Sequence, residues 1–249
     1  MVFWEGASLW ILGRREGDAP FPKTAYHAHH AVQVTLALRG SFALEGRERR
    51  VSAAAAAVAP DVEHAFEADQ LVAHLFVDPE GRPGRELQSS LFSDGQIVAI
   101  PAERVEQLPA RLLAGFEAPR RTDKSLVELG RSVLAHLAPG SERDERPEVR
   151  VRKMSAWAAE RLETPVSLAD AARHVGLSSG RARHLFVEQT GLPFRTYLLW
   201  RRLMRAVELS AGGSSLTEAA HGAGFSDSSH LSRTFRRMFG IAADSLRLA

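Results

Sequence analysis

The C-terminal part of the chain contains an internal repeat, which restricts its fold more than any other feature of the sequence. Residues 167–191 align with residues 215–240, first at an offset of 48 residues and, after a one-residue insertion, at an offset of 49. Each copy begins with Ser-Leu-x-Asp/Glu, a pattern typical of a helix start. A short alanine-rich segment and a turn that contains glycine follow. Each copy then has a serine able to cap the next helix and a second amphipathic segment. Because small residues let two helices cross closely and a glycine turn joins them at a steep angle, each copy predicts a helix-turn-helix motif. The matched residues are Ser167, Leu168, Ala171, Ala172, Gly176, Ser178, Phe186 and Gly191, and in the second copy Ser215, Leu216, Ala219, Ala220, Gly224, Ser226, Phe235 and Gly240.

The segment between the two copies predicts one continuous helix over residues 193–211. It begins with Pro193, has apolar residues at helical spacing and is followed by two glycines. A helix of these 19 residues is about 28 Å long, close to the ~34 Å between successive major-groove faces of DNA. One chain can therefore hold two recognition helices about one turn of DNA apart.

The second helix of each copy carries a face of hydroxyl, histidine and arginine side chains without an acidic residue. DNA phosphates repel carboxylates, whereas arginine can donate two hydrogen bonds to guanine and serine can bind bases or phosphates. We expect this face to contact DNA, with Arg236 and Arg237 as phosphate contacts or solvated charges. Ion pairing on the protein surface is the alternative for Arg183 and Arg233. The candidate DNA-binding residues are Ser179, Gly180, Arg183 and His184 in the first copy and Ser229, His230, Ser232, Arg233, Arg236 and Arg237 in the second.

The charge distribution divides the chain. Residues 150–249 contain 15 basic and 8 acidic residues, a net charge of +7, whereas residues 1–149 contain 17 and 22, a net charge of −5. A basic part beside an acidic part is typical of one module that faces a polyanion and one that does not. Residues 139–149, rich in Pro, Gly, Ser and charge, predict a linker between the two.

Two stretches of the C-terminal part together resemble the AraC/XylS family of transcription regulators. "GLPFRTYLLWRRLMRA", in which Tyr197, Arg202, Leu203 and Ala206 fall in place, is similar to the family's linker helix, and "GFSDSSHLSRTFRRMFG" is similar to its signature at the second motif. The resemblance covers about the last hundred residues. It implies that the start of each second helix enters the major groove, and that the protein is a one-component bacterial regulator that binds double-stranded promoter DNA. It also implies an N-terminal domain for a small-molecule effector, and RNA polymerase as a partner.

The N-terminal part predicts a different architecture. Alternating apolar residues predict strands within 31–46, with a turn at Arg39-Gly40, and further strands within 71–79 and 95–101. Residues 102–138 switch to helical periodicity and predict two helices, each with an apolar stripe. These stripes can pack on a barrel or form a dimer seam. The first stripe contains Leu108, Leu112, Leu113 and Phe116, and the second contains Leu126, Leu129, Val133, Leu134 and Leu137.

The sequence as a whole predicts an α+β protein of two domains. We expect a cupin-like sensor β-barrel over 1–101, a helical extension that mediates homodimerisation over 102–138, a linker over 139–149 and an all-α DNA-binding domain over 150–249. Within that last domain, the helix-turn-helix motifs occupy 167–191 and 215–240, and the linker helix 193–211 joins them.

A histidine pattern in the N-terminal part resembles the first cupin motif. His27, His29, Gln33 and Gly40 have the spacing H-x-H-x3-Q-x6-G, with Gln33 where a glutamate ligand usually stands, and His64 falls at the histidine of the second motif. Imidazoles two residues apart on a strand point to the same face, so His27 and His29 can converge inside a barrel. With His64 they predict a site for Zn²⁺, Ni²⁺ or Fe²⁺. The alternative is a polar ligand pocket, or a relic of a metal site.

Three classes of function follow from these patterns. A transcription regulator that senses a small molecule or a metal is the reading we prefer, and we do not expect an enzyme. The rivals are a metal-dependent cupin enzyme fused to a DNA-binding tail and an architectural protein whose N-terminal domain only dimerises. The chain contains no cysteine, which excludes disulfides and thiolate chemistry. Without an apparent signal peptide or an apolar run of membrane-spanning length, it is expected to be cytoplasmic, associated with the nucleoid when bound, and to have no membrane partner.

Overall fold

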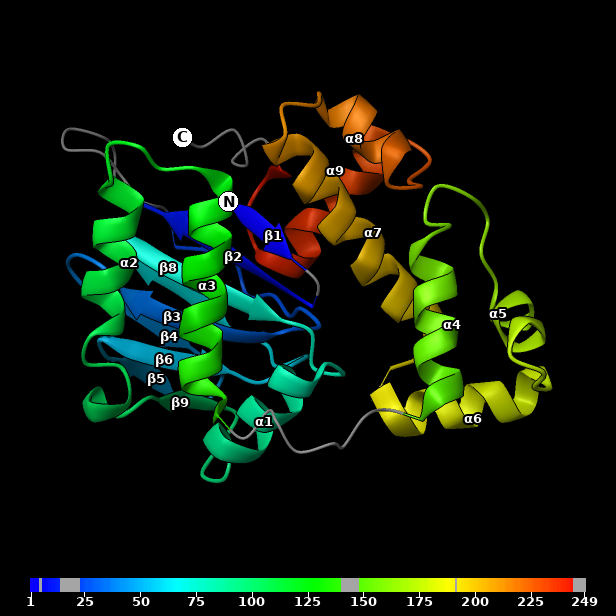
Figure 1. The fold of residues 1–249 in the computed structure, drawn as a ribbon, viewed down its shortest axis with the longest axis horizontal. Coiled ribbons are helices and arrows are strands. Elements are labelled where there is room, and N and C mark those ends of the chain that lie inside the picture. The colour runs from blue at the N-terminus through cyan, green and yellow to red at the C-terminus, as the bar shows by residue number, and fades with distance from the viewer. Residues whose placement is uncertain (5, 14–22, 140–147, 191, 244–249) are drawn as a thin grey trace. The chain divides into compact units, whose positions relative to one another are not determined.

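The computed structural model describes the chain except for residues 5, 14–22, 140–147, 191 and 244–249 (Figure 1). The chain forms two compact units, one built mainly from residues 1–144 and one mainly from residues 145–237. Most of the predicted linker, residues 140–147, lies outside the described residues. Among the helices that the structure describes, none is both long and apolar enough to span a lipid bilayer.

The N-terminal unit contains two antiparallel sheets, one of six strands in the order β1-β2-β8-β3-β6-β9 and one of three strands in the order β5-β4-β7. A short helix, α1 (Arg82–Leu91), lies between β8 and β9 in the sequence. The strands are β1 (Val2–Trp4), β2 (Ala7–Leu12), β3 (Val32–Ala37), β4 (Phe42–Glu45), β5 (Arg50–Ser52), β6 (Ala55–Val58), β7 (Ala65–Ala68), β8 (Val72–Val77) and β9 (Ile97–Ala99).

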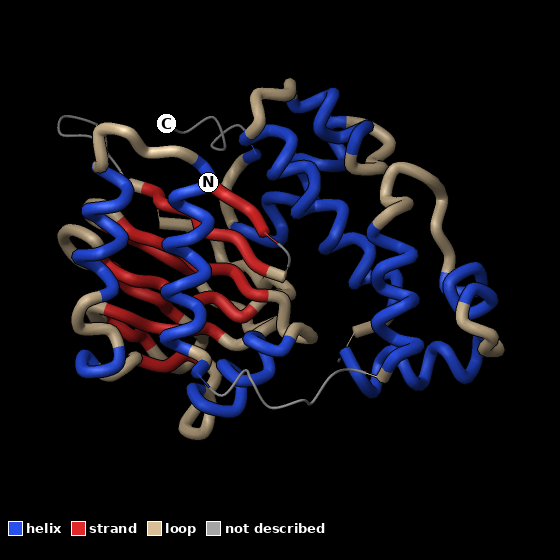
Figure 2. The backbone as a smooth tube through the Cα atoms, in the orientation of Figure 1, coloured by secondary structure: helices blue, strands red, loops and turns tan. Residues whose placement is uncertain are grey.

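Two helices, α2 (Leu108–Glu117) and α3 (Asp123–Leu137), lie across the outer face of the large sheet (Figure 2). Alternation along the strands explains this arrangement: Val34 and Leu36 of β3 belong to the core beneath the helices, whereas Gln33 and Thr35 lie on the opposite face. The apolar stripes predicted for residues 102–138 supply the other half of this core, which contains Leu108, Leu112, Leu126, Val133, Leu134 and Leu137. The stripes thus pack on the sheet, and homodimerisation stays a prediction.

The strands expected within 31–46, 71–79 and 95–101 are present as β3, β4, β8 and β9. The expected closed barrel is wrong for the described strands, because they form two separate sheets, joined across by an isolated bridge between His27 and His64. Alternation shows that a strand has a buried face, but it carries no information on whether the sheet edges pair. The alanine-rich segment 52–60 contains β6, which lies between β3 and β9 in the large sheet.

The C-terminal unit is all-α. The predicted motifs are present as α5–α6 and α8–α9, and the predicted linker helix is present as α7, which starts one residue later than expected. One helix, α4, was not predicted, and it starts at the last residue of the segment assigned to the linker. The helices are α4 (Val149–Ala159), α5 (Leu168–His174), α6 (Ser179–Thr190), α7 (Phe194–Ala211), α8 (Leu216–Gly222) and α9 (Ser228–Phe239).

Hydrogen bonds hold these helices in register. Ser215 and Glu218 form the predicted capping box at the start of α8. In the first copy the hydroxyl of Ser167 accepts from the backbone N–H of Asp170. The guanidinium of Arg202, on α7, donates to the carbonyl oxygen of Leu162 at 3.0 Å. This hydrogen bond ties the linker helix to the turn that follows α4.

The inserted residue of the second copy changes the cap of its recognition helix. Ser178 caps α6, because its hydroxyl accepts from the backbone N–H of Arg181 at 3.3 Å. The sequence alignment predicts Ser226 for the same role in α9, but the carboxylate of Asp227 accepts from the N–H of His230 at 2.7 Å instead. The insertion lies between the glycine of the turn and the cap, so equivalent residues of α6 and α9 are 49 positions apart.

Candidate functional site

Most of the predicted DNA-binding residues lie on the N-terminal halves of α6 and α9, whereas Arg236 and Arg237 lie in the last turn of α9. Most of them are exposed, and His230 and Ser232 are half-buried. Both helices bury their opposite sides, for example through Phe186 in α6 and Phe235 in α9. The exposed residues of this set are Ser179, Gly180, Arg183, His184, Ser229, Arg233, Arg236 and Arg237.

The arginines of these faces are available to a partner. Within the described part of the chain, Arg183, Arg233, Arg236 and Arg237 form no ion pair within 4.0 Å, in contrast to Arg205, which pairs with Glu208 on α7. The alternative of surface ion pairing for Arg183 and Arg233 therefore has no support among the described residues.

One acid lies at the edge of the second face, where none was expected. A hydrogen bond from the backbone of His230, another from Ser226 and the nearby charge of Arg233 lower the pKa of Asp227. The carboxylate is thus held at the helix N-terminus, where the macrodipole favours a negative charge. The first copy has the neutral Ser178 at this position.

Arg181 is an exposed candidate that the sequence analysis missed. At the offset of 49 it is equivalent to His230, so it lies one helical turn before His184 on the same side of α6. Use of the 49-residue offset for the whole second helix of each copy would have found Arg181.

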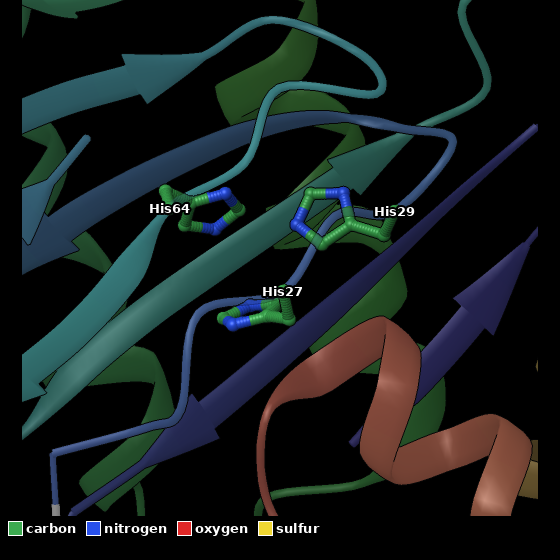
Figure 3. A group of neighbouring side chains, drawn as sticks. All are labelled: His27, His29 and His64. Carbon is green, nitrogen blue, oxygen red and sulfur yellow. The ribbon is translucent and has the colours of Figure 1, made fainter. Parts of the chain in front are cut away.

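The predicted histidines of the N-terminal unit also come together (Figure 3). His27 and His29 lie on the segment before β3, and His64 lies directly before β7. Each offers one ring nitrogen, and the three atoms lie within 4.8 Å of one another. Small ring movements would bring them to the ~2.0–2.1 Å at which histidine nitrogens bind Zn²⁺.

Backbone hydrogen bonds orient two of these rings. Nδ1 of His27 donates to the carbonyl oxygen of Ala25 at 2.8 Å, and Nδ1 of His64 donates to that of Val62 at 2.9 Å. The protons are therefore on Nδ1, which leaves Nε2 of each ring as an electron-pair donor. Histidine ligands of metals show the same arrangement, in which the other ring nitrogen donates to a carbonyl.

Burial keeps the cluster uncharged. It lowers the pKa of His27 to about 4, and that of His64 well below its usual range. The pKa of His29 is also lowered by burial. Near neutral pH all three are neutral imidazoles, the form that binds metal.

Gln33 lies beside the cluster as predicted. Its Oε1 accepts a hydrogen bond of 2.8 Å from Nε2 of His29, so Gln33 orients the third ring of the cluster. Its amide group donates to the hydroxyl of Thr35 at 3.0 Å, and that hydroxyl lies 3.0 Å from Nδ1 of His74. The amide orientation is thus fixed by a buried chain of polar groups that the sequence analysis did not find.

A second buried histidine, His30, holds the surrounding loops. Its ring nitrogens lie 2.7 Å from a carboxylate oxygen of Asp61 and 2.5 Å from one of Glu80. Burial opposes the charged form, but these hydrogen bonds outweigh it and raise the pKa of His30 to about 9. Asp61 has a left-handed backbone with φ +61°, and its N–H donates to the carbonyl oxygen of His29, so this clamp ties the turn before His64 to the cluster.

Comparisons with known proteins agree with this architecture. Residues 171–248 match a family described as a helix-turn-helix domain. The HTH-type transcriptional activator RhaS of Escherichia fergusonii is 33% identical over 107 residues, which are 43% of this chain and 38% of that protein. RhaS of Escherichia coli strain SE11 is 28% identical over 167 residues, 66% of this chain and 60% of that protein. The chain thus spans about two fifths to three fifths of these relatives.

The fold of the whole chain is similar to that of solved ToxT structures from Vibrio cholerae. ToxT of strain O395 has a TM-score of 0.60 at 13% identity over 96% of both chains. Wild-type ToxT of strain SCE256, solved with an unsaturated fatty acid bound, has a TM-score of 0.57 at 12% identity over 99% of this chain and 98% of that one. With a sheet unit followed by two helix-turn-helix motifs joined by a linker helix, the chain has the same fold as ToxT, and its C-terminal unit is similar to the helix-turn-helix domain of these transcription activators.

Proposed function

We propose that the protein is a transcription regulator that binds specific promoter DNA through both α6 and α9. The observation that carries this proposal is the pair of equivalent helix starts, each exposed, rich in hydroxyl and basic groups, and capped at the same register. The helix between them, α7, has 18 residues and is therefore about 27 Å long, which suits two successive major-groove faces.

Selection of binding sites by the full-length protein from a pool of random DNA duplexes tests this proposal. We expect two enriched sequence blocks whose centres lie about 10–10.5 base pairs apart, and affinity that falls steeply with salt. Insertion of five base pairs between the blocks rotates one by half a turn and should weaken binding to the level of a single block. Enrichment of no sequence, or of only one block, would contradict the proposal.

We also propose that the N-terminal unit senses a divalent metal, with His27, His29 and His64 as ligands and Gln33 as a possible fourth. Its support is the convergence of three buried, neutral imidazoles, two of which are oriented by backbone carbonyls. Bound Zn²⁺, Ni²⁺ or Fe²⁺ would supply a positive charge that locks the segment before β3 to the segment before β7.

An organic effector in place of a metal is the second candidate for this unit. ToxT, which has the same fold, was solved with a fatty acid bound. We propose a sensor rather than an enzyme for either case, because the C-terminal unit is similar to the helix-turn-helix domain of transcription activators. RNA polymerase and a second copy of the chain are the further partners we propose.

Native mass spectrometry of the full-length protein tests the metal, with the protein purified without a histidine tag or a metal column. We expect a mass excess of one metal ion per chain that is lost in His27→Ala and His64→Ala. His221→Ala, at an exposed histidine of α8, is the matched control and should keep the ion. An unchanged apo mass after incubation with Zn²⁺, Ni²⁺ and Fe²⁺ would leave the organic effector as the proposal.

A further inference from the structure

The inner face of the large sheet beside the histidine cluster is polar. Ser8 of β2 pairs in register with Phe76 of β8, which pairs with Gln33 of β3, and the next row contains Trp10, His74 and Thr35. All six side chains are buried. The opposite face of the same strands carries the apolar core beneath α2 and α3, so the polar block is confined to the interior between the two sheets.

Two hydrogen-bond donors of this block have no acceptor. Trp10 and Ser8 are each only 3% exposed, so solvent does not reach Nε1 of Trp10 or Oγ of Ser8. Neither atom has a hydrogen-bond partner within the described part of the chain. Native proteins rarely leave a buried donor unpaired, because its desolvation is then uncompensated. Trp10 lines the same cavity as His27, Gln33 and His74.

A metal ion alone accounts for only part of this pattern. Nε2 of His64 is also buried without a hydrogen-bond partner in the described structure, and a cation would satisfy this electron pair. The indole N–H of Trp10 can only donate, so a cation cannot satisfy it. A second species that carries an acceptor atom would satisfy this donor.

The charge of the site favours an anion as that species. Three neutral imidazoles would leave a divalent ion with its full charge in a buried place. Asp61, whose charge acts on His29, is already hydrogen-bonded to His30. A three-histidine centre also keeps a coordination position open for an exogenous ligand.

We infer that the cavity lined by Trp10, His27, Gln33 and His74 binds a small monoanion, such as a carboxylate, as a ligand of the histidine-bound metal and an acceptor for Trp10. This inference rests on the proposed metal site and adds the chemical class of its second ligand. The protein would then respond to metal and anion together, because the anion binds only when the ion is present.

Cobalt spectroscopy of the full-length protein tests the inference. The protein is stripped with a chelator, loaded with Co²⁺ and titrated with sodium azide and sodium acetate while the visible cobalt absorption is recorded. We expect Co²⁺ absorption in the wild type and a saturable shift with each anion. Trp10→Phe should bind Co²⁺ as the wild type does but weaken the anions about 10-fold or more, since it removes one hydrogen bond to a charged group.

Two further variants sharpen the test. Trp157→Phe is the matched control, because Trp157 lies on α4 and stacks on His174; it should leave the anion affinity unchanged. Ser8→Ala removes the second unpaired donor, which does not line the cavity, and should also leave the anion affinity unchanged.

The outcomes separate the two proposals. Absence of Co²⁺ absorption would overturn the metal site and this inference together. If Co²⁺ binds but its absorption does not change with 100 mM azide or acetate, this inference alone is overturned. Water would then be the acceptor for Trp10. The same conclusion follows if Trp10→Phe binds both Co²⁺ and the anions as the wild type does.

Discussion

The backbone N–H of His230 donates a 2.7 Å hydrogen bond to Oδ1 of Asp227, and this bond caps α9 at the point where the second copy of the repeat has its extra residue. The cap aligns α9 with α6, so that Ser228 and Ser179 each start a recognition helix. Two helices that differ in sequence therefore have corresponding positions at their exposed starts.

Removal of this cap should destabilise the second motif. Asp227→Ala leaves an N–H of α9 without its acceptor, and we expect Tm to fall by a few degrees and DNA affinity to fall with it. Ser226→Ala is the control, because Ser226 is the cap that the sequence alignment predicts; its effect should be smaller. An equal or larger loss in Ser226→Ala, measured by thermal unfolding, would contradict the assignment.

The Asp227 cap should also depend on pH. The lowered pKa of Asp227 means that its stabilisation is fully present above the unfolded value near 3.8 and is lost as the pH falls through the folded pKa. Thermal unfolding of wild type and Asp227→Asn from pH 6 to pH 2.5 should show a difference in Tm that shrinks at the acid end. A constant difference would contradict an ionised cap.

The two turn glycines should respond very differently to the same substitution. Gly176 and Gly224 both have a positive φ, +69° and +78°. A Cβ at Gly176 meets nothing within 4 Å, so Gly176→Ala should cost only the ~1–2 kcal/mol of a left-handed backbone. A Cβ at Gly224 would clash with the carbonyl oxygen of Leu162, so Gly224→Ala should cost at least twice as much. Urea unfolding of both variants measures the difference, and equal losses would contradict the close approach.

Substitutions on α9 should separate base contacts from phosphate contacts. Arg233→Ala should cost ~1–3 kcal/mol of binding free energy on the selected site and relax the preference at one base pair. Arg236→Ala, one turn nearer the helix end, should weaken binding to all sequences equally and reduce the salt dependence. Gel-shift titrations against the selected site and its single-base variants measure both. A uniform loss in Arg233→Ala would make Arg233 a phosphate contact.

The His30 clamp should make the N-terminal unit less stable at alkaline pH. Because the folded pKa of about 9 is above the unfolded value of 6.5, the stabilisation is fully present below pH 6.5 and is lost as the pH rises through 9. We expect the metal-free wild type to lose Tm between pH 6.5 and pH 10, and His30→Gln to have a lower Tm with a flatter profile. Parallel profiles for the two proteins would contradict a charged His30.

Gln33→Glu should convert the histidine centre into a tighter metal site. A buried carboxylate costs stability without an ion, so the metal-free variant should have a lower Tm than the wild type, and zinc should raise its Tm by more. Gln70→Glu, the same change at an exposed position, should leave both values unchanged. Equal zinc shifts in Gln33→Glu and the wild type would place residue 33 outside the coordination sphere.

Local chemistry in the sequence was sufficient for the C-terminal unit. Caps at Ser167 and Ser215, glycine turns at Gly176 and Gly224, and helical periodicity are determined by neighbours in the chain, so the two motifs and the linker helix could be predicted from it. The change of cap from Ser226 to Asp227 could not, because both residues are good caps and only the folded turn places one of them over the N–H of His230.

The sequence also determined which residues of the N-terminal unit form a chemical group, since the spacing of His27, His29 and Gln33 and the position of His64 predict one cluster. Only the tertiary structure decided how that cluster is held. Alternation gives each strand two faces but not its partners, so the separation into two sheets and the row of Trp10, His74 and Thr35 could not be predicted. Strand pairing is a long-range property, set by which faces bury the most apolar surface. It places polar atoms of Trp10 and His64 in the interior, where the described residues offer them no hydrogen-bond partner.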